Sequence, residues 1–368
     1  MNIKISSFNV SFVVGQQNKI FGSEAHFIKN TIQREKGNIK TIFINRINFI
    51  KKYINDKKFG MLSIQELNNT KIDAQYIINK LKKINNSLEF YLDNIEVSFG
   101  NPTLMIVYNN DIYGSIVHKY ICDSYVPEID NVYVKYKSNA GKYLNPIKTN
   151  SIQNLKGRPI QFLVTKKNEK YYLMINIHGC NFEKYIIKYN KDTFHINNDA
   201  SKVHVKKNEI KFGRNIKSDD YEIFMKTNKS LYKFYNNIIQ NRLNEFIKIK
   251  KISKSIKFHK IIFTGDTNDH TNSLSDLRLK INNQNIILSY KGNPPKSCCY
   301  YKSYNIKTKT KKLQPYRSTA DKILTNYENQ SIIKIVRNQT KKYTIKNKTK
   351  KIPFISDHYA VEVYVNHI

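Results

Sequence analysis

Five short polar signatures stand where apolar, strand-like runs of the chain end. They are Ser6-Ser7-Phe8-Asn9, Gln65-Glu66, Asn176-Ile177-His178, Gly265-Asp266-Thr267-Asn268 and Ser356-Asp357-His358. Any one of them has an ordinary structural explanation, since a Gly-Asp turn follows many buried strands. Together they supply hard oxygen ligands for Mg²⁺, a base for water and donors for phosphate oxygens. The set therefore indicates divalent-metal phosphoryl transfer.

Strand alternation predicts that these side chains point the same way. Residues two apart on a strand face one side of a sheet, so Asn176 lies on the side of His178, and Asp266 on the side of Asn268. Strands are expected over residues 3–10, 61–65, 104–108, 160–164, 172–178, 261–265, 285–290, 323–325 and 360–365.

Helical patterns lie between these strands. Apolar residues recur at helical spacing over 43–54, a capping box over 70–73 opens a second helix, and a longer helix is expected from Asp219 to Phe246. Consecutive strands over 88–118 suggest antiparallel meanders. The mixed order of elements predicts an α+β sandwich with two sheets inside and helices outside.

The length of the chain limits the number of domains, and its charge limits the kinds of partner. The chain has 368 residues, with 63 Lys and Arg against 28 Asp and Glu, and a formal net charge of +35. Since there is no Gly/Ser or Pro linker, we expect a single catalytic domain over 1–368, with Lys/Asn-rich loops inserted near 187–217, 302–314 and 340–351. The charge reflects either A/T-rich codon bias or an anionic partner: nucleic acid, an inositol phosphate or an anionic membrane.

Several classes of protein are excluded. No apolar run approaches the roughly 18 residues that a membrane-spanning helix needs. Residues 1–10 have the pattern of a strand and not of a signal peptide. Four irregularly spaced cysteines without a CxxC motif predict an intracellular, reducing compartment, cytoplasm or nucleus, and no secretion. Gly-x-Ser-x-Gly, Walker A and dinucleotide-binding motifs are all absent from the sequence.

In this order the five signatures resemble the motifs of the endonuclease/exonuclease/phosphatase superfamily, whose fold is that of pancreatic deoxyribonuclease. A sixth match is Ala320-Asp321-Lys322-Ile323-Leu324, similar to the strand that precedes the C-terminal motif. The matches extend over residues 3–365. This resemblance implies a four-layer α/β/β/α sandwich of two mixed, mainly antiparallel sheets. It also implies hydrolysis of phosphoesters by direct attack of water, with Mg²⁺ or Mn²⁺ as cofactor.

The resemblance implies a metal site as well. Glu66 matches the principal ligand of the metal, Asn9 matches the carboxamide that helps to hold the site, and Asp357 matches a carboxylate beside the metal.

The remaining matches imply catalytic roles. Asp266 would orient or deprotonate the attacking water, and Asn268 would contact the phosphate. His358 would stabilise the developing charge or act as a base, with Asp321 as its orienting partner. His178 would contact the phosphate or protonate the leaving group.

The substrate is less clearly indicated than the family. His270 stands where inositol-polyphosphate 5-phosphatases carry Arg, although Pro294-Pro295-Lys296-Ser297 is similar to their substrate loop. The form Gly265-Asp266-Thr267-Asn268 also occurs in tyrosyl-DNA phosphodiesterases. We expect a nuclease or DNA-end-processing phosphodiesterase that binds nucleic acid. The alternatives are an inositol-polyphosphate phosphatase and a non-catalytic basic scaffold for nucleic acid or lipid.

Overall fold

The structure is a computed structural model that describes part of the chain in full. Side chains are described for residues 1–10, 48–67, 78–93, 104–122, 159–179, 236–267, 274–293, 295–297, 319–336 and 358–367. Outside these ranges it describes the backbone of the strands and helical residues that are named below.

Six strands form the first sheet, in the order β22-β25-β1-β2-β4-β3. In that order they span Lys334–Ile335, Val361–Asn366, Asn2–Asn9, Phe59–Gln65, Leu104–Asn109 and Leu88–Asp93. β1 and β2 pair in parallel, with Asn9 opposite Gln65, and the other neighbours pair antiparallel.

Seven strands form the second sheet, in the order β17-β18-β21-β16-β11-β10-β5. In that order they span Asp276–Ile281, Gln284–Ser289, Asp321–Thr325, Phe258–Asp266, Lys170–His178, Pro159–Lys167 and Ser115–Asp123. β11 and β16 pair in parallel, with His178 opposite Asp266. All other neighbours in this sheet pair antiparallel.

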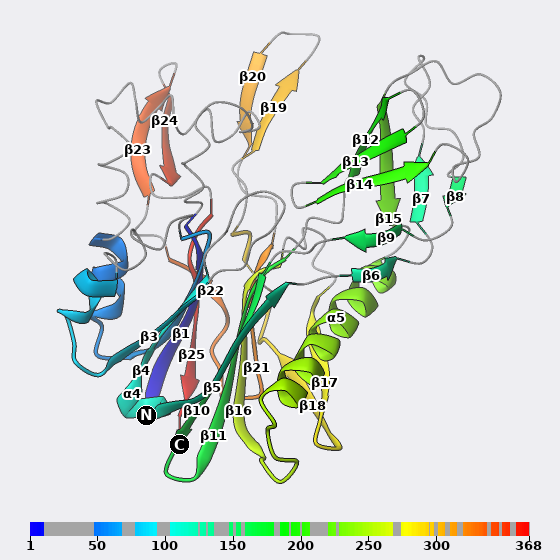
Figure 1. Cartoon of the computed structure of the whole chain (residues 1–368). Coiled ribbons are helices and arrows are strands. Elements are labelled where there is room, and N and C mark those ends of the chain that lie inside the picture. The colour runs from blue at the N-terminus through cyan, green and yellow to red at the C-terminus, as the bar shows by residue number, and fades with distance from the viewer. Residues whose placement is uncertain are drawn as a thin grey trace.

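The two sheets pack face to face, and helices cover their outer faces (Figure 1). Ile5 and Met61 of the first sheet meet Met174 and Ile262 of the second in a core between the sheets. Helical residues 48–54 and 78–82 cover the outside of the first sheet, where Ile50 and Leu81 are buried. Such a four-layer arrangement confirms the predicted sandwich of two mixed, mainly antiparallel sheets.

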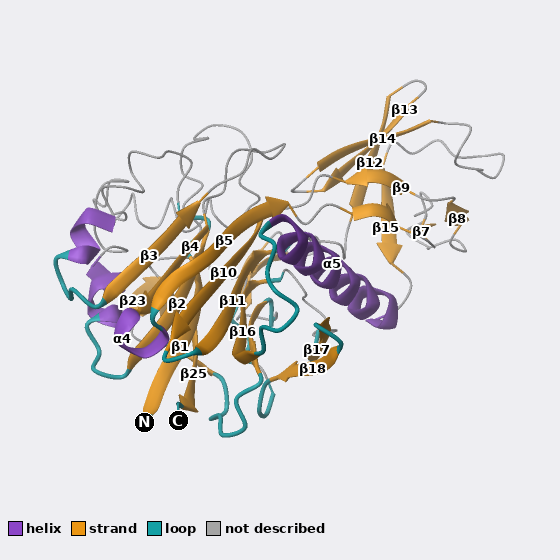
Figure 2. Cartoon of the chain, turned by 60° about the horizontal axis from the view of Figure 1, so that its bottom comes forward, coloured by secondary structure: helices purple, strands orange, loops and turns teal. Residues whose placement is uncertain are grey.

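Helix α5 (Asn228–Ile249) covers the outside of the second sheet (Figure 2). Its Phe246 ring stacks on Phe162 of β10, with ring centroids 5.3 Å apart. A short helix, α4 (Asn110–Tyr113), joins β4 to β5. Among the described residues no helix combines the length and apolar character needed to cross a membrane.

The inward-facing side chains of the central strands change character along their length. On β1 they run Ile3, Ile5, Ser7 and Asn9, and on β11 Met174 is followed by Asn176 and His178. The space between the sheets therefore has three layers along the strands. It is apolar first, then lined by small or amide side chains, and finally lined by ionisable side chains at one end of the sandwich. β1 begins at the lower end in Figure 1, so the ionisable layer lies at the upper end.

Each of the nine runs that the sequence predicts as strands is a strand, but three expectations are wrong. β5 does not continue a meander with β3 and β4, because it crosses to the second sheet and pairs with β10. The long helix begins at Asn228 and not at Asp219, since Asp220–Met225 forms strand β15. The run Tyr-Glu-Ile-Phe-Met is as typical of a strand as of a helix. Residues 43–47 and the capping box over 70–73 lie outside the described residues.

The third wrong expectation is that the Lys/Asn-rich tracts are loops, because strands run through all three. A third sheet has the order β14-β13-β12-β15-β7-β8. These strands span Ser201–Lys206, Thr193–Asn198, Tyr185–Asn190, Asp220–Met225, Val132–Lys135 and Ile147–Thr149. Three strand pairs are formed by β19 (Tyr301–Asn305) with β20 (Thr310–Gln314), β23 (Thr340–Ile345) with β24 (Lys348–Pro353), and β6 (Val126–Ile129) with β9 (Ile152–Leu155). Ile, Tyr and Val alternating with Lys favour strands in spite of the polar composition.

Candidate active site

Asn9 and Glu66 stand at the ends of two parallel strands of the first sheet. Asn9 closes β1 and is buried, and Glu66 follows the last residue of β2 with 16% of its side chain exposed. The Asn9 Nδ2 donates to Glu66 Oε1 at 3.3 Å and, across to the second sheet, to Asp266 Oδ2 at 2.8 Å. One carboxamide therefore holds two carboxylates that come from different sheets.

Glu66 has a left-handed backbone, with φ of +54°. A non-glycine residue in this region is strained by about 1–2 kcal/mol, and such strain is found mostly at functional sites. The left-handed turn ends the strand and directs the carboxylate toward the second sheet, where it meets His178.

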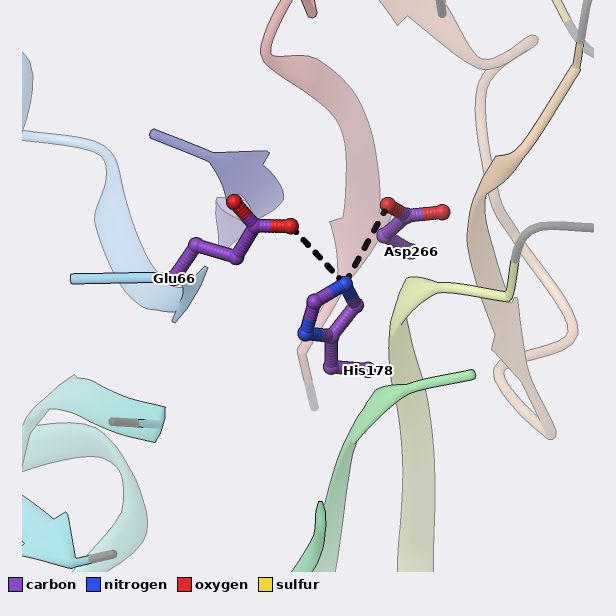
Figure 3. Close-up of side chains that lie close together, drawn as sticks. All are labelled: Glu66, His178 and Asp266. Carbon is purple, nitrogen blue, oxygen red and sulfur yellow. Dashed lines mark ion pairs between the residues drawn. The ribbon is translucent and has the colours of Figure 1, made fainter. Parts of the chain in front are cut away.

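His178 and Asp266 stand at the ends of the parallel pair β11 and β16 and are both buried. The His178 Nε2 lies 3.0 Å from Glu66 Oε1 and 3.9 Å from Asp266 Oδ2 (Figure 3). Gly265 allows this pairing, because a Cβ there would lie 2.0 Å from the Ile177 carbonyl oxygen and its φ is +141°. The imidazole thus lies between two carboxylates.

His358 approaches the same oxygen of Asp266 as His178 does. Its Nε2 lies 3.7 Å from Asp266 Oδ2, and its Nδ1 lies 3.0 Å from Asp321 Oδ2. Asp321 begins β21 directly opposite Asp266 in the antiparallel register. The Ser297 hydroxyl donates to the same Asp321 oxygen at 2.6 Å. Asp321 therefore fixes the orientation of the His358 ring.

Burial raises the pKa of Asp321 above its ordinary value, and the charge of Asp266 adds to this rise, whereas His358 and Ser297 act in the opposite direction. Its Oδ1 atom is buried and has no hydrogen-bond partner among the described residues. A carboxylate oxygen without a donor favours the protonated form, so this geometry agrees with the raised pKa.

Two groups of side chains could hold a cation, and they share Asp266. Glu66, His178 and Asp266 form one, and Asp266, Asp321 and His358 form the other; within each group the ligand atoms lie within 4.8 Å of one another. Convergent carboxylates are suited to a hard divalent cation, and the adjoining imidazoles can contact an anion.

Six of the eight residues that the sequence singles out come together here: Asn9, Glu66, His178, Asp266, Asp321 and His358. Asn268 and Asp357 lie outside the described residues.

The supporting residues below the site were not identified as site residues from the sequence. The Gln65 Nε2 donates to Asn176 Oδ1 at 2.7 Å, and the Asn176 Nδ2 lies within hydrogen-bonding distance of Gln161 Oε1 at 3.2 Å. The Thr264 hydroxyl donates to Ser63 at 2.6 Å. The signal was a polar residue at the inward position next to each candidate site residue on β1, β2, β11 and β16. Ser297, which holds Asp321, has no comparable signal.

No protein-family model matches the chain, and no curated protein is similar to it in sequence. Solved structures do resemble it along its whole length. An endonuclease/exonuclease/phosphatase family protein from Bacteroides thetaiotaomicron has 12% identity and a TM-score of 0.43, covering 100% of this chain and 98% of that one. A mannosyl-6-phosphatase from the same organism has 12% identity and a TM-score of 0.42, covering 99% and 100%. TDP2 from C. elegans has 10% identity and a TM-score of 0.44, covering 99% and 75%.

The expected resemblance to this superfamily is thus found among solved structures. Similarity this distant does not show that two proteins share an activity, so any functional argument must rest on the side chains of the site.

The strain at Glu66 predicts an unusual order of stability. Glu66→Gly and Glu66→Ala remove the same carboxylate, but only glycine accepts a positive φ without cost. The glycine variant should be more stable than the alanine variant by about 1 kcal/mol in urea unfolding. At Glu89 in β3, where the backbone is extended, the same pair of substitutions should give the opposite order. Equal stabilities at position 66 would contradict the strain.

The raised pKa of Asp321 predicts a pH dependence of stability. Because the folded state holds the proton more strongly than the unfolded chain, the free energy of unfolding should fall as pH rises from about 4 through the raised pKa. Asp321→Asn removes this dependence. Its stability relative to the wild type should therefore improve over that interval, by at most about 1.4 kcal/mol per pH unit.

Urea unfolding of both proteins between pH 4 and pH 7 measures this difference. The same comparison in a His358→Ala background should have the same sign and be larger, because the ring no longer lowers the pKa of the carboxyl. A difference that shrinks with rising pH would show that the pKa is lowered by folding.

Proposed function

We propose that this protein is a divalent-metal-dependent phosphoester hydrolase of the endonuclease/exonuclease/phosphatase superfamily, and that nucleic acid is its substrate. The observation that carries the proposal is the convergence of Glu66, His178, Asp266 and His358 from strands or strand ends of both sheets. The six motifs that match the superfamily in order support it.

The donor set fits a hard cation. Glu66 and Asp266 present carboxylate oxygens, the Asn9 carboxamide holds both of them through its Nδ2, and Glu66 is the partly exposed member. A bound Mg²⁺ or Mn²⁺ would supply positive charge that stabilises the phosphate in the transition state. Glu66 would be its main ligand, with Asn9 and Asp357 beside it.

The chain's own residues would perform the proton transfers. Asp266 lies at a rigid strand end, and its carboxylate orients a water and accepts its proton as the new oxygen–phosphorus bond forms. The bond from phosphorus to the leaving oxygen breaks, and a histidine returns a proton to that oxygen. His178, between the two carboxylates, is placed for this role, and Asn268 would contact the phosphate.

His358 would act next to the same oxygen of Asp266. Asp321 accepts its Nδ1–H and so turns Nε2 toward Asp266 and the phosphate. In this position the ring stabilises charge on a non-bridging oxygen or serves as a base.

The net charge of +35 supports nucleic acid as the substrate, because a phosphodiester polymer offers many anionic contacts to a basic protein. A test incubates the purified protein with Mg²⁺ and labelled single-stranded DNA, duplex DNA, RNA and inositol phosphates. Cleavage of a nucleic acid supports the proposal. Release of phosphate from inositol phosphates alone would identify the phosphatase alternative, and no turnover of any substrate would leave the non-catalytic scaffold.

Removal of the principal carboxylate should abolish activity and cation binding together. We predict that Glu66→Gln lowers kcat at least about 100-fold in Mg²⁺ while the fold is retained. Mg²⁺ should raise the Tm of the wild type, because a ligand that binds only the folded state stabilises it, and should not raise that of the variant.

The matched control is Glu169→Gln, which removes an exposed carboxylate in the turn between β10 and β11, paired with Lys166. Its activity and its response to Mg²⁺ should equal those of the wild type. Full turnover of Glu66→Gln in EDTA would refute the metal site.

A further inference from the structure

A second concentration of charge lies at the opposite end of the sandwich. A cavity of about 720 Å³ opens between the end of α5, the loop 250–257 and the turn of the β17–β18 hairpin. Lys248, Lys251, Lys254 and Lys280 line it, and no carboxylate is among the residues that line it. The other lining side chains are amides, and two isoleucines.

The fold holds these lysines in a fixed frame. On α5, the Asn236 and Gln240 side chains each make two hydrogen bonds to the backbone of the edge strand β17, at Arg278 and Lys280. On the hairpin, the Asn282 Nδ2 donates to the Ile256 carbonyl at 2.7 Å. The helix, the hairpin and the loop are thereby joined around the cavity.

The lysines are not needed to satisfy the end of the helix. The Ile252 N–H donates to the Ile247 carbonyl at 3.0 Å, and the Lys250 N–H donates to Phe246 at 3.0 Å, so backbone groups already satisfy these carbonyls. None of the four ammonium groups that line the cavity has an ion pair within the described part of the chain. Their charge is therefore available to a ligand.

Lys251 stands at a position that ordinarily favours glycine. It lies in the turn just after α5 with φ of +50°, in the left-handed conformation that closes many helices. A side chain there costs about 1 kcal/mol relative to glycine. Asn282 and Asn283 in the hairpin turn also have positive φ, and both line the same cavity. A strained lysine beside three others indicates a use for its charge.

We propose that this cavity is a second nucleic-acid site, which binds the phosphate backbone away from the catalytic centre. Lysine and amide side chains are typical partners of phosphate and sugar. The lining holds no aromatic residue of the kind that anchors proteins in a lipid surface. The inference rests on the proposed function only for the choice of nucleic acid as ligand.

The two sites are far apart but lie along one element. The cavity adjoins the start of β16, and Asp266 is the last residue of this nine-residue strand. At about 3.3 Å per residue the separation is roughly 26 Å. A polymer can contact both sites, whereas a small phosphoester can contact only one, so the cavity should affect polymer binding and not the chemical step.

The test variant replaces all four lysines: Lys248→Gln, Lys251→Asn, Lys254→Gln and Lys280→Gln. Asparagine tolerates the positive φ at position 251. The matched control changes four exposed lysines that belong to the first sheet or its covering helices and loops, Lys57, Lys82, Lys83 and Lys334, to Gln. Both proteins lose the same net charge, so any difference between them belongs to the cavity.

Fluorescence anisotropy in EDTA measures binding of a labelled single-stranded DNA of about 30 nucleotides without cleavage. The cavity variant should raise Kd at least about tenfold at 0.1 M salt and lower the slope of log Kd against log salt by about 3. The control variant should change both much less. Equal effects of the two variants on Kd and on its salt dependence would overturn the proposal. They would show that the cavity lysines contribute only to the overall positive charge of the protein.

Two further measurements separate this inference from its rivals. Turnover of bis(p-nitrophenyl) phosphate, which is too small to reach the cavity, should be the same in the cavity variant as in the wild type. If the wild type cleaves neither this diester nor any of the nucleic acids and inositol phosphates named above, while DNA binding still depends on the cavity, the catalytic proposal fails and the second site stands. Sedimentation with phosphatidylserine vesicles that is lost only in the cavity variant, with DNA binding unchanged, would assign the cavity to a lipid surface instead.

Discussion

The hydrogen bond between the Gln65 and Asn176 amides, 2.7 Å long and buried, is the contact on which the geometry of the site depends. It joins the two sheets directly below the ionisable layer. Gln65 precedes Glu66, and Asn176 lies two residues before His178, so the bond sets the separation of a carboxylate on one sheet from an imidazole on the other. Apolar surfaces can slide without a large loss, but a buried amide that loses its partner is costly. The polar layer therefore fixes one register of the sheets.

The end of the sandwich that holds the candidate site is rich in carboxylates, although the chain as a whole is strongly positive. Glu66, Asp266 and Asp321 gather within a chain of net charge +35, and two of them are almost fully buried. Buried carboxylates that lie close together repel each other and lose solvation, so the folded state is less stable than an apolar site would make it. The left-handed backbone of Glu66 adds strain. A bound cation would relieve the repulsion, which links stability to the proposed chemistry.

Much of the fold could be predicted from the sequence, because the core strands are short apolar runs that end in polar residues. The nine strands follow from those local patterns. The meeting of Asn9, Glu66, His178, Asp266, Asp321 and His358 is predicted from the order of the motifs and their resemblance to a known superfamily. What could not be predicted depends on contacts between distant segments. Ser297 bonds Asp321 across 24 residues of sequence, β5 changes sheets, and the third sheet is built from segments rich in Lys and Asn. The lysine cavity forms only when α5 docks on the β17–β18 hairpin.

The position of a bound Mn²⁺ tests most directly whether Glu66 and its neighbours form a metal centre. Crystals grown with Mn²⁺ would be measured near the manganese absorption edge, where anomalous scattering locates the ion independently of the refined coordinates. We predict a peak roughly 2.2 Å from a Glu66 carboxylate oxygen, on the side that faces Asp266. A fully occupied peak elsewhere, with Glu66 still in contact with Asn9 and His178 and with no ion, would contradict the assignment of this site as the metal centre.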